Sequence, residues 1–466
     1  MENLSIFVNG KWVDSSSKNV IEVENPANKT IFGKVTAANE EDVNLAVKAA
    51  KDAFVDWKNT PIDKRIEYIN KMIEYFEKNV DEIADIVVQE LGSIRKITKQ
   101  VHVIDYIEDA KNYVRLTKDK EMIEDNGEYK VYHEPVGVVA CLTPWNFPFG
   151  QIEKKVIPAL LMGNTIVLKP SQKTPFSSFY YARAAKYANL PAGVFNLITG
   201  RGAEVGNVLA SHKDVDMVSF TGSTKGGIEV SKLALDSVKR LALELGGKSA
   251  SILLEGYDYE KAIKKTLSAV YPNAGQACSS KTRLLAPRKD REKIEEIVIK
   301  VTKEYKHGNP DNPENDYGPV QSKDAFDKVM RYIELGKKES NLLYEGEWIE
   351  DDGYYIPPVV FTDVDNNSKI AQEEIFGPVE CIIFYDTVEE AIEIANDSKY
   401  GLHGMVFGPD DEALRVAREI RTGQLQVNDG SRGHFAPFGG YKQSGIGREG
   451  SKYGLDEYTE IKTIFN

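Results

Sequence analysis

One cysteine lies in a short polar segment, "NAGQACSSKTR", that favours a reactive thiol. Asn273, Gln276, Ser279 and Lys281 surround Cys278. A free cysteine is most often a buried structural residue, and that interpretation remains the alternative here. The polar neighbours, in a loop between a predicted helix and a predicted strand, favour a thiolate that attacks an electrophilic carbon.

A carboxylate and an amide could supply the other groups that such chemistry needs. Glu244 ends the apolar run "LALEL", where it could project into a cleft, although alone it also fits a salt-bridged surface acid. Asn146, in "TPWNFP", lies in a turn that Pro144 and Pro148 make rigid. An asparagine held in this way can donate an N–H to a developing oxyanion. The six histidines lie in no motif that pairs one of them with the cysteine.

Three further segments have the composition of a nucleotide site. Gly222 and Ser223, in "FTGSTKGG", link an apolar strand to a helix and could approach a phosphate, or simply form a capped turn. Gly202 lies in a similar turn, "TGRGAEVG". Lys169 ends the strand of "NTIVLKPSQ" and is either a nucleotide contact or an exposed strand-end cation. The string "GIGREG" near the C-terminus lacks the following βαβ unit of a dinucleotide fingerprint and is predicted to be a turn-rich loop.

Bulk composition excludes several classes of function. The chain has 466 residues, a formal net charge of −13 and three widely spaced cysteines. An acidic chain lacks the basic surface that nucleic acids and anionic membranes require. Neither a disulfide framework nor a metal site is predicted. Because no signal peptide or membrane-spanning run is seen, we expect a cytoplasmic protein.

The periodicity of apolar residues predicts the elements that position these groups. Residues 40–118 have helical spacing, and residues 136–245 alternate five short apolar runs with four helical stretches, which predicts a parallel sheet. A second α/β pattern follows over residues 246–430. A hairpin at Asn126-Gly127 and an alternating C-terminal segment have no obvious core of their own, so we expect them to make an oligomer contact.

Seven segments together resemble the aldehyde dehydrogenase superfamily in order and spacing: "TPWNFP", "KPS", "FTGS", "LELGGK", "GQAC", "EEIFGPV" and "PFGGYKQSGIGRE". The resemblance implies an α/β fold with a five-stranded Rossmann-variant parallel sheet, a second α/β catalytic domain and a small β oligomerisation arm. The implied boundaries are 1–121 and 137–245 for the NAD(P)-binding domain, 246–430 for the catalytic domain, and 122–136 and 450–466 for the arm.

The resemblance also implies a role for individual residues. Cys278 matches the nucleophile, Glu244 the general base and Asn146 the oxyanion donor. Two further residues match groups that handle protons near the base, namely Lys155 and Glu449. The positions that match cofactor contacts are Trp145, Lys169, Ser171, Gln172, Gly202, Gly222, Ser223, Glu374 and Phe376.

One position departs from the family pattern. Members that prefer NAD usually carry a glutamate where this chain has Gln172. A neutral amide removes the repulsion that excludes a 2′-phosphate, so the expected cofactor is NAD, with NADP open.

The expected reaction is oxidation of an aldehyde to a free acid through a thioester on Cys278, hydrolysed by water that Glu244 activates. The alternatives are an acylating enzyme that uses coenzyme A, a semialdehyde-specific enzyme, and a thiol hydrolase without a redox step. Small residues beside the cysteine and the aromatic Phe147 and Phe438 favour a small-to-medium aldehyde. Arg432 is either a contact for a carboxylate-bearing semialdehyde or a solvated loop residue. We expect a homodimer or homotetramer.

Overall fold

Alternating apolar residues in the parallel strands of the first sheet explain why helices cover both of its faces. On strand β8 (Val138–Leu142), Val138 and Ala140 join one hydrophobic cluster, while Val139 and Cys141 join the other. Successive side chains of a strand point to opposite faces, so both faces of β8 are buried. A parallel sheet of this kind needs a helical layer on each side.

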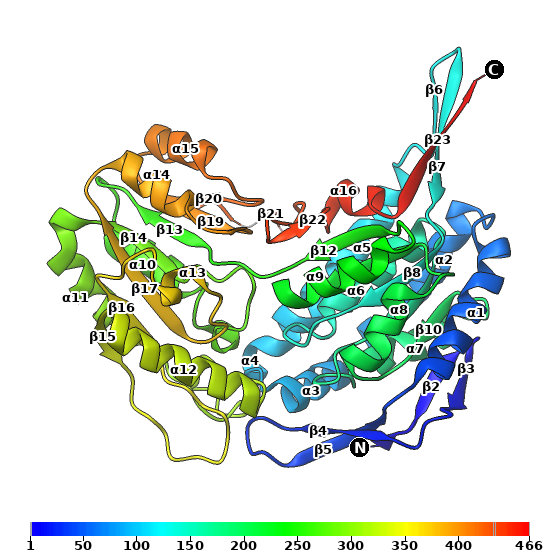
Figure 1. Cartoon of the computed structure of the whole chain (residues 1–466), viewed down its shortest axis with the longest axis horizontal. Helices are drawn as coiled ribbons and strands as arrows, with labels where there is room; N and C mark the ends of the chain where they lie inside the picture. Colours follow the sequence, from blue (N-terminus) through cyan, green and yellow to red (C-terminus); the bar gives the residue numbers. More distant parts are fainter. Residues whose placement is uncertain (1, 432, 434, 466) are drawn as a thin grey trace.

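Two α/β lobes and a projecting arm make up the chain (Figure 1). The computed structural model describes residues 2–431, 433 and 435–465. The first lobe contains an eight-stranded sheet whose five central strands are parallel, which confirms the predicted five-stranded parallel sheet. Short antiparallel strands, which were not predicted, extend both edges. In spatial order the strands are β22 (Gly445–Ile446), β12 (Arg240–Glu244), β11 (Met217–Thr221), β8, β9 (Thr165–Lys169), β10 (Phe195–Leu197), β2 (Ser5–Val8) and β3 (Lys11–Asp14).

The helices of this lobe divide between the two faces according to the hydrophobic cluster that they join. One face is covered by α1 (Glu40–Trp57), α8 (Asn207–Ser211) and α9 (Thr224–Leu235). The other is covered by α2 (Ile62–Lys78), α3 (Val80–Leu91), α5 (Asp105–Lys118), α6 (Gly150–Leu161) and α7 (Ser178–Tyr187). Shorter helical segments are α4 (Arg95–Thr98), η1 (Lys99–Ile104) and η2 (Gly202–Gly206).

The second lobe has its own sheet and its own hydrophobic cluster, as the second α/β pattern predicted. In spatial order its strands are β15 (Asn341–Glu345), β16 (Val359–Thr362), β17 (Val379–Tyr385), β14 (Arg283–Pro287), β13 (Ala250–Leu253), β19 (Gly404–Phe407) and β20 (Gln426–Val427). Its helices are α10 (Tyr259–Leu267), η3 (Pro272–Gly275), η4 (Arg288–Asp290), α11 (Arg291–Thr302), α12 (Lys323–Glu339), α13 (Lys369–Gln372), α14 (Val388–Asn396) and α15 (Asp410–Glu419). Two small sheets complete the fold, one of β1 (Glu2–Asn3), β5 (Ile31–Thr36) and β4 (Val20–Glu24), the other of β18 (Tyr400–Gly401) and β21 (Tyr441–Lys442).

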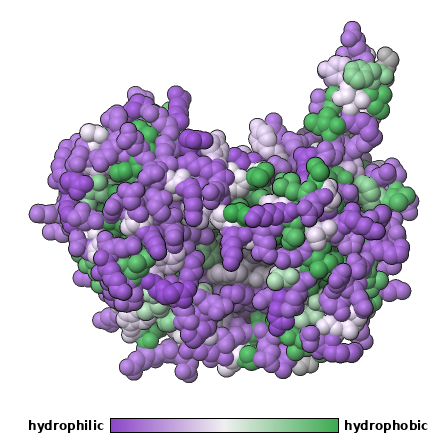
Figure 2. Space-filling model, viewed as in Figure 1, coloured by the Kyte–Doolittle hydropathy of each residue, from purple (hydrophilic) through white to green (hydrophobic). Residues whose placement is uncertain are grey.

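The arm joins the predicted hairpin to the C-terminal strand. Strands β6 (Ile123–Asp125) and β7 (Tyr129–Pro135) flank the turn, and β23 (Thr459–Phe465), which follows α16 (Ser451–Asp456), pairs with β7 along its whole length. Figure 1 shows this sheet standing out from the first lobe, and Figure 2 shows apolar side chains on it. Ile461 is 68% and Phe465 79% exposed. The arm therefore presents an apolar surface outside both cores.

Among the described residues, no helix combines the length and the apolar character needed to cross a bilayer.

Candidate active site

The candidate site begins at the carboxyl ends of three neighbouring parallel strands. Strands β8, β11 and β12 lie side by side, and ligands of such sheets bind beyond this edge. Asn146 lies in the loop after β8, Gly222 in the loop after β11, and Glu244 is the last residue of β12. The sheet thus gathers residues that are almost one hundred positions apart in the chain.

Glu244 is a buried carboxyl group at the end of β12. Its side chain belongs to a residue that is only 4% exposed, and neither Oε1 nor Oε2 accepts a hydrogen bond from any described residue. Burial, reinforced by the nearby charge of Glu449 and opposed by Lys155, raises the pKa of Glu244 well above its ordinary value. A carboxylate destabilised in this way is a stronger base than one at the surface.

The two neighbouring charged groups form a buried ion pair. The Nζ atom of Lys155, on α6, lies 2.7 Å from Oε1 of Glu449 and 3.1 Å from Oγ of Ser219. Both members of the pair are buried. The structure therefore brings Lys155 and Glu449 together beside Glu244.

The loop that carries Cys278 has an unusual backbone. Asn273, Ala274 and Gly275 all have positive φ, at 54°, 54° and 73°. A side chain at Gly275 would place its Cβ only 2.1 Å from the carbonyl oxygen of Gly377, so only glycine fits. Consecutive left-handed residues persist only where their surroundings hold them, and such strain gathers at functional sites. Cys278 follows this turn and is partly exposed, unlike the other two cysteines, which are buried.

Side-chain amides hold this loop against Asn146. Asn273 donates from Nδ2 to the Asn146 carbonyl oxygen at 3.0 Å, and Asn146 donates from Nδ2 to the Gln276 carbonyl oxygen at 3.0 Å. Gln276 in turn accepts a hydrogen bond at Oε1 from the Gln321 backbone N–H at 2.8 Å. The amide of Asn146 is thereby fixed beside the nucleophile loop.

Cys278 lies at the junction of two cavities. The larger, of about 360 Å³, is lined by Glu244, Asn146 and Cys278 together with the strand ends of the first lobe. The smaller, of about 340 Å³, is also lined by Cys278, and by Phe147 and Phe438. In Figure 2 a recess is visible between the two lobes. A molecule in either cavity would thus lie against Cys278.

The larger cavity contains most of the predicted cofactor contacts from the loops. The rings of Trp145 and Phe376 meet edge to face at 5.3 Å, and Phe376 has a positive φ of 64°, which is rare for a bulky residue. Ser223 caps α9 by accepting the Gly226 N–H. The predicted contacts that line this cavity are Trp145, Gly222, Ser223, Glu374 and Phe376.

A third cavity, of about 210 Å³, is lined by two further residues that were predicted to contact the nucleotide. Lys169 and Gly202 both line it. Burial lowers the pKa of Lys169 to about 8, and a Cβ at Gly202 would meet no atom within 4 Å, so the space beside it is open. Ser171 and Gln172 lie in the turn after β9 and line none of these three cavities.

Several lining residues escaped the sequence analysis because they carry no motif. The larger cavity also includes Lys173, Asp324 and Lys328, the last two from the start of α12. The smaller cavity also includes polar residues of α5 and α6, namely Asp105, Tyr106, Asp109 and Lys154. Their helical segments had been identified only by apolar periodicity, which says nothing of where the polar face points. Arg432, the predicted outer-pocket residue, lies outside the described residues.

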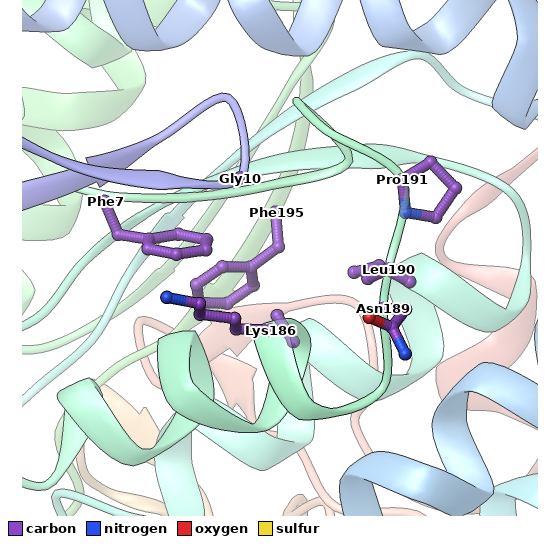
Figure 3. Close-up of a pocket in the computed structure, with 8 residues that line it drawn as sticks. Phe7, Gly10, Lys186, Asn189, Leu190, Pro191 and Phe195 are labelled. Atoms are coloured by element: carbon purple, nitrogen blue, oxygen red, sulfur yellow. The ribbon is translucent and has the colours of Figure 1, made fainter.

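A separate pocket lies at the opposite edge of the first sheet. Figure 3 shows Phe7 and Phe195 side by side in it, with Lys186 and Asn189 at its rim. Its lining comes from β2, β10 and the end of α7, and includes neither a thiol nor a carboxylate. It offers no group for the chemistry predicted at Cys278.

Comparison with known proteins agrees with this geometry. The sequence profile of the aldehyde dehydrogenase family matches residues 12–464. The chain belongs to the aldehyde dehydrogenase family. A protein of Staphylococcus epidermidis, provisionally named an aldehyde dehydrogenase, is 40% identical over 98% of both chains.

Solved aldehyde dehydrogenases share the fold. A mutant of aldehyde dehydrogenase C from Pseudomonas syringae, in complex with NAD+ and octanal, superposes with a TM-score of 0.97 and 38% identity over 99% of this chain and 96% of its own. The NAD+ complex of an aldehyde dehydrogenase from Bacillus cereus superposes with a TM-score of 0.95 and 37% identity, over 100% of this chain and 96% of its own. The α/β architecture predicted for this aldehyde dehydrogenase is therefore confirmed.

Proposed function

We propose that this aldehyde dehydrogenase oxidises a small-to-medium aldehyde to the free carboxylic acid, with Cys278 as nucleophile and Glu244 as general base. The observation that carries the proposal is the position of Cys278, which lines both cavities, with Glu244 in the larger one. One cavity would then hold the cofactor and the other the aldehyde. The cofactor follows from solved relatives that bind NAD+.

The residues present fit a nicotinamide dinucleotide. Glycine and aromatic residues line the larger cavity of about 360 Å³, and Gly202 leaves open space in the third. Trp145, Ser223, Glu374 and Phe376 would hold the nicotinamide half, and Lys169 with Gly202 the adenosine half. We assign Ser171 and Gln172, in the adjoining turn, to the same half. Bound NAD+ supplies the acceptor for the hydride.

The first step would be attack of the Cys278 thiolate on the aldehyde carbon. A C–S bond forms, the carbonyl π bond breaks, and its electron pair goes to oxygen. The Asn146 amide, fixed beside the loop, would donate an N–H to this oxyanion, as would the Cys278 backbone. When the oxyanion collapses, hydride departs and a thioester remains on Cys278.

The second step would be hydrolysis of the thioester. Glu244 takes a proton from water, the hydroxide adds to the acyl carbon, and the C–S bond breaks to return the thiolate and release the acid. The raised pKa of Glu244 makes it a suitable base. Lys155 and Glu449, paired beside it, would pass the proton onward.

Glu244 favours this outcome over transfer to coenzyme A, because a thiol acceptor needs less help from a base than water does. The semialdehyde alternative depends on Arg432, which lies outside the described residues. NADP stays open because Gln172 lacks the charge that would repel a 2′-phosphate.

The test is reduction of the nicotinamide with a panel of aldehydes, with NAD or NADP and with or without coenzyme A. We expect absorbance to rise with NAD without coenzyme A, and not at all in Cys278→Ala. A rise that requires coenzyme A would overturn the hydrolytic step, and activity without nicotinamide would favour the thiol hydrolase.

We also propose that the arm mediates assembly into a homodimer or homotetramer in the cytoplasm. The exposed Ile461 and Phe465 support a second copy as its partner, and the three free cysteines fit a reducing compartment. Sedimentation of the chain and of Ile461→Asp, which should dissociate the oligomer, tests this.

A further inference from the structure

Lys173 is a cation in the wall of the larger cavity that no motif identified. Its Nζ atom lies 5.5 Å from the centre of the Trp145 ring and donates a hydrogen bond to Ser322 Oγ at 2.8 Å. The residue is partly buried and follows Gln172 in the turn after β9. It therefore extends across the gap between the two lobes, beside a ring already assigned to the cofactor.

Two cations of this cavity have no carboxylate partner. Among the described residues, neither Lys173 nor Lys328 lies within 4.0 Å of an acidic oxygen, and Lys328 donates to the Glu374 carbonyl oxygen at 2.8 Å. By contrast, Lys154 and Lys155, which are also buried or nearly so, each form an ion pair. A partly buried ammonium without an anion is costly, because its charge is only partly solvated.

The positive charge of Lys173 is not compensated by a nearby anion among the described residues. Burial lowers its pKa, and the charge of Asp324, which also lines the cavity but lies beyond ion-pair distance, opposes that shift. The carboxylates of the cavity do not reach it: Glu374 accepts the Gly247 N–H, and Glu244 is at the strand end. A ligand with two adjacent negative charges would complete the solvation of this ammonium.

We propose that Lys173 is a further cofactor-binding residue, whose ammonium contacts the diphosphate of the dinucleotide in the larger cavity. This inference rests on the proposed cofactor. The cation also lies over one face of Trp145, so it can act together with a ring that is assigned to the cofactor. Lys173 thereby ties the cofactor to both lobes, since its present partner Ser322 caps α12 of the second lobe.

The competing explanation is that Lys173 only braces Ser322. Ser322→Ala removes that hydrogen bond but leaves the ammonium in place, whereas Lys173→Gln removes the charge and Lys173→Arg keeps it. A matched control is Lys186→Gln, which removes an exposed lysine from the remote pocket of Figure 3. These four variants distinguish an effect of the Lys173 charge on binding from an effect of its hydrogen bond to Ser322.

The experiment is calorimetric titration of the full-length protein and the four variants with NAD and with ADP-ribose, which has the diphosphate but no nicotinamide, at two salt concentrations. We expect Lys173→Gln to raise both dissociation constants roughly tenfold, as for one lost charged hydrogen bond. We also expect its salt dependence to be shallower. Lys173→Arg, Ser322→Ala and Lys186→Gln should stay within about threefold of the unaltered protein.

Two results would overturn the inference: unchanged binding in Lys173→Gln, or an equal loss in Ser322→Ala. If the unaltered protein binds neither ligand, the proposed cofactor fails as well, and the two failures are thereby distinguishable. Thermal unfolding of each variant shows whether a loss of binding reflects a loss of folding. If Lys173→Gln proves unstable, Lys173→Arg is the deciding variant: normal binding in it supports the role of the charge, and lost binding contradicts it.

Discussion

Glu244 and Cys278 line the same cavity, but Glu244 belongs to a β-strand and Cys278 to an irregular loop. Glu244 ends β12, the second strand from one edge of the sheet, and it has no hydrogen-bond partner among the described residues. Cys278 follows a loop with a left-handed backbone that side-chain amides hold in place. The sheet gives the base a rigid position and leaves its charge unsatisfied, whereas the loop depends on its polar contacts for the position of the nucleophile.

The largest expected effect separates these two roles. In Glu244→Gln the thiol and the oxyanion donors remain, so the first turnover should still reduce one nicotinamide per site. Steady-state turnover should fall about 10³-fold, because water loses its base. Rapid-mixing absorbance measurements check this. Glu296→Gln, at an exposed position on α11, is the control. Loss of the first turnover as well would contradict the division of roles.

A second change tests the amide that links the regions. Asn146→Ala removes an oxyanion donor, so the first turnover itself should slow on the order of 10²-fold, in contrast to Glu244→Gln. The same rapid-mixing experiment measures it. A normal first turnover in Asn146→Ala would show that the amide only braces the loop.

The pH profile sharpens the comparison further. Glu244 acts as a base only when ionised, and its pKa is raised, so hydrolysis should be slow at low pH. It should rise about tenfold per pH unit towards a plateau above that pKa. This rising part of the pH–rate profile should lie above the pH range in which an ordinary glutamate titrates, and it should be absent in Glu244→Gln. A rise that persists in that variant would belong to another group.

The smallest effect concerns the contacts of the nucleophile loop. Gln276→Ala leaves the buried Gln321 N–H without its partner, which should loosen the loop by ~1–3 kcal/mol and lower activity only severalfold. Hydrogen exchange of the Gln321 amide measures this directly. Gln100→Ala, which loses an exposed hydrogen bond to Asp105, should leave it unchanged. Equal exchange rates in the unaltered protein, Gln276→Ala and Gln100→Ala would mean that the loop does not depend on the Gln276 hydrogen bond.

Much of the site could be predicted because its residues lie at element ends that the sequence marks clearly. Asn146, Gly222 and Glu244 each follow or end an apolar strand, and parallel strands bring their carboxyl ends together. The Asn126-Gly127 turn likewise identified the hairpin, whose Gly127 has a φ of +80°. That β7 pairs with β23, more than three hundred residues away, was beyond any local pattern.

The rest depended on contacts between distant segments. Lys173, Asp324 and Lys328 carry no motif, and only the approach of the two lobes puts them in one cavity. The same holds for Asp105 and Asp109, whose place on α5 says nothing by itself of a second cavity beside Cys278. Apolar periodicity reports which face of a helix is buried, but not what its polar face meets.

By itself, the sequence determined the chemical inventory: a thiol among polar residues, a carboxylate and an amide at strand ends, and a parallel sheet built from local α/β connections. Only the tertiary structure decided the state of those groups. Among the residues that the structure describes, it buried Glu244 without a hydrogen-bond partner, paired Lys155 with Glu449, and left Lys173 without a carboxylate partner. The reason is that charge and reactivity depend on solvation by neighbouring groups, and those neighbours come from distant parts of the chain.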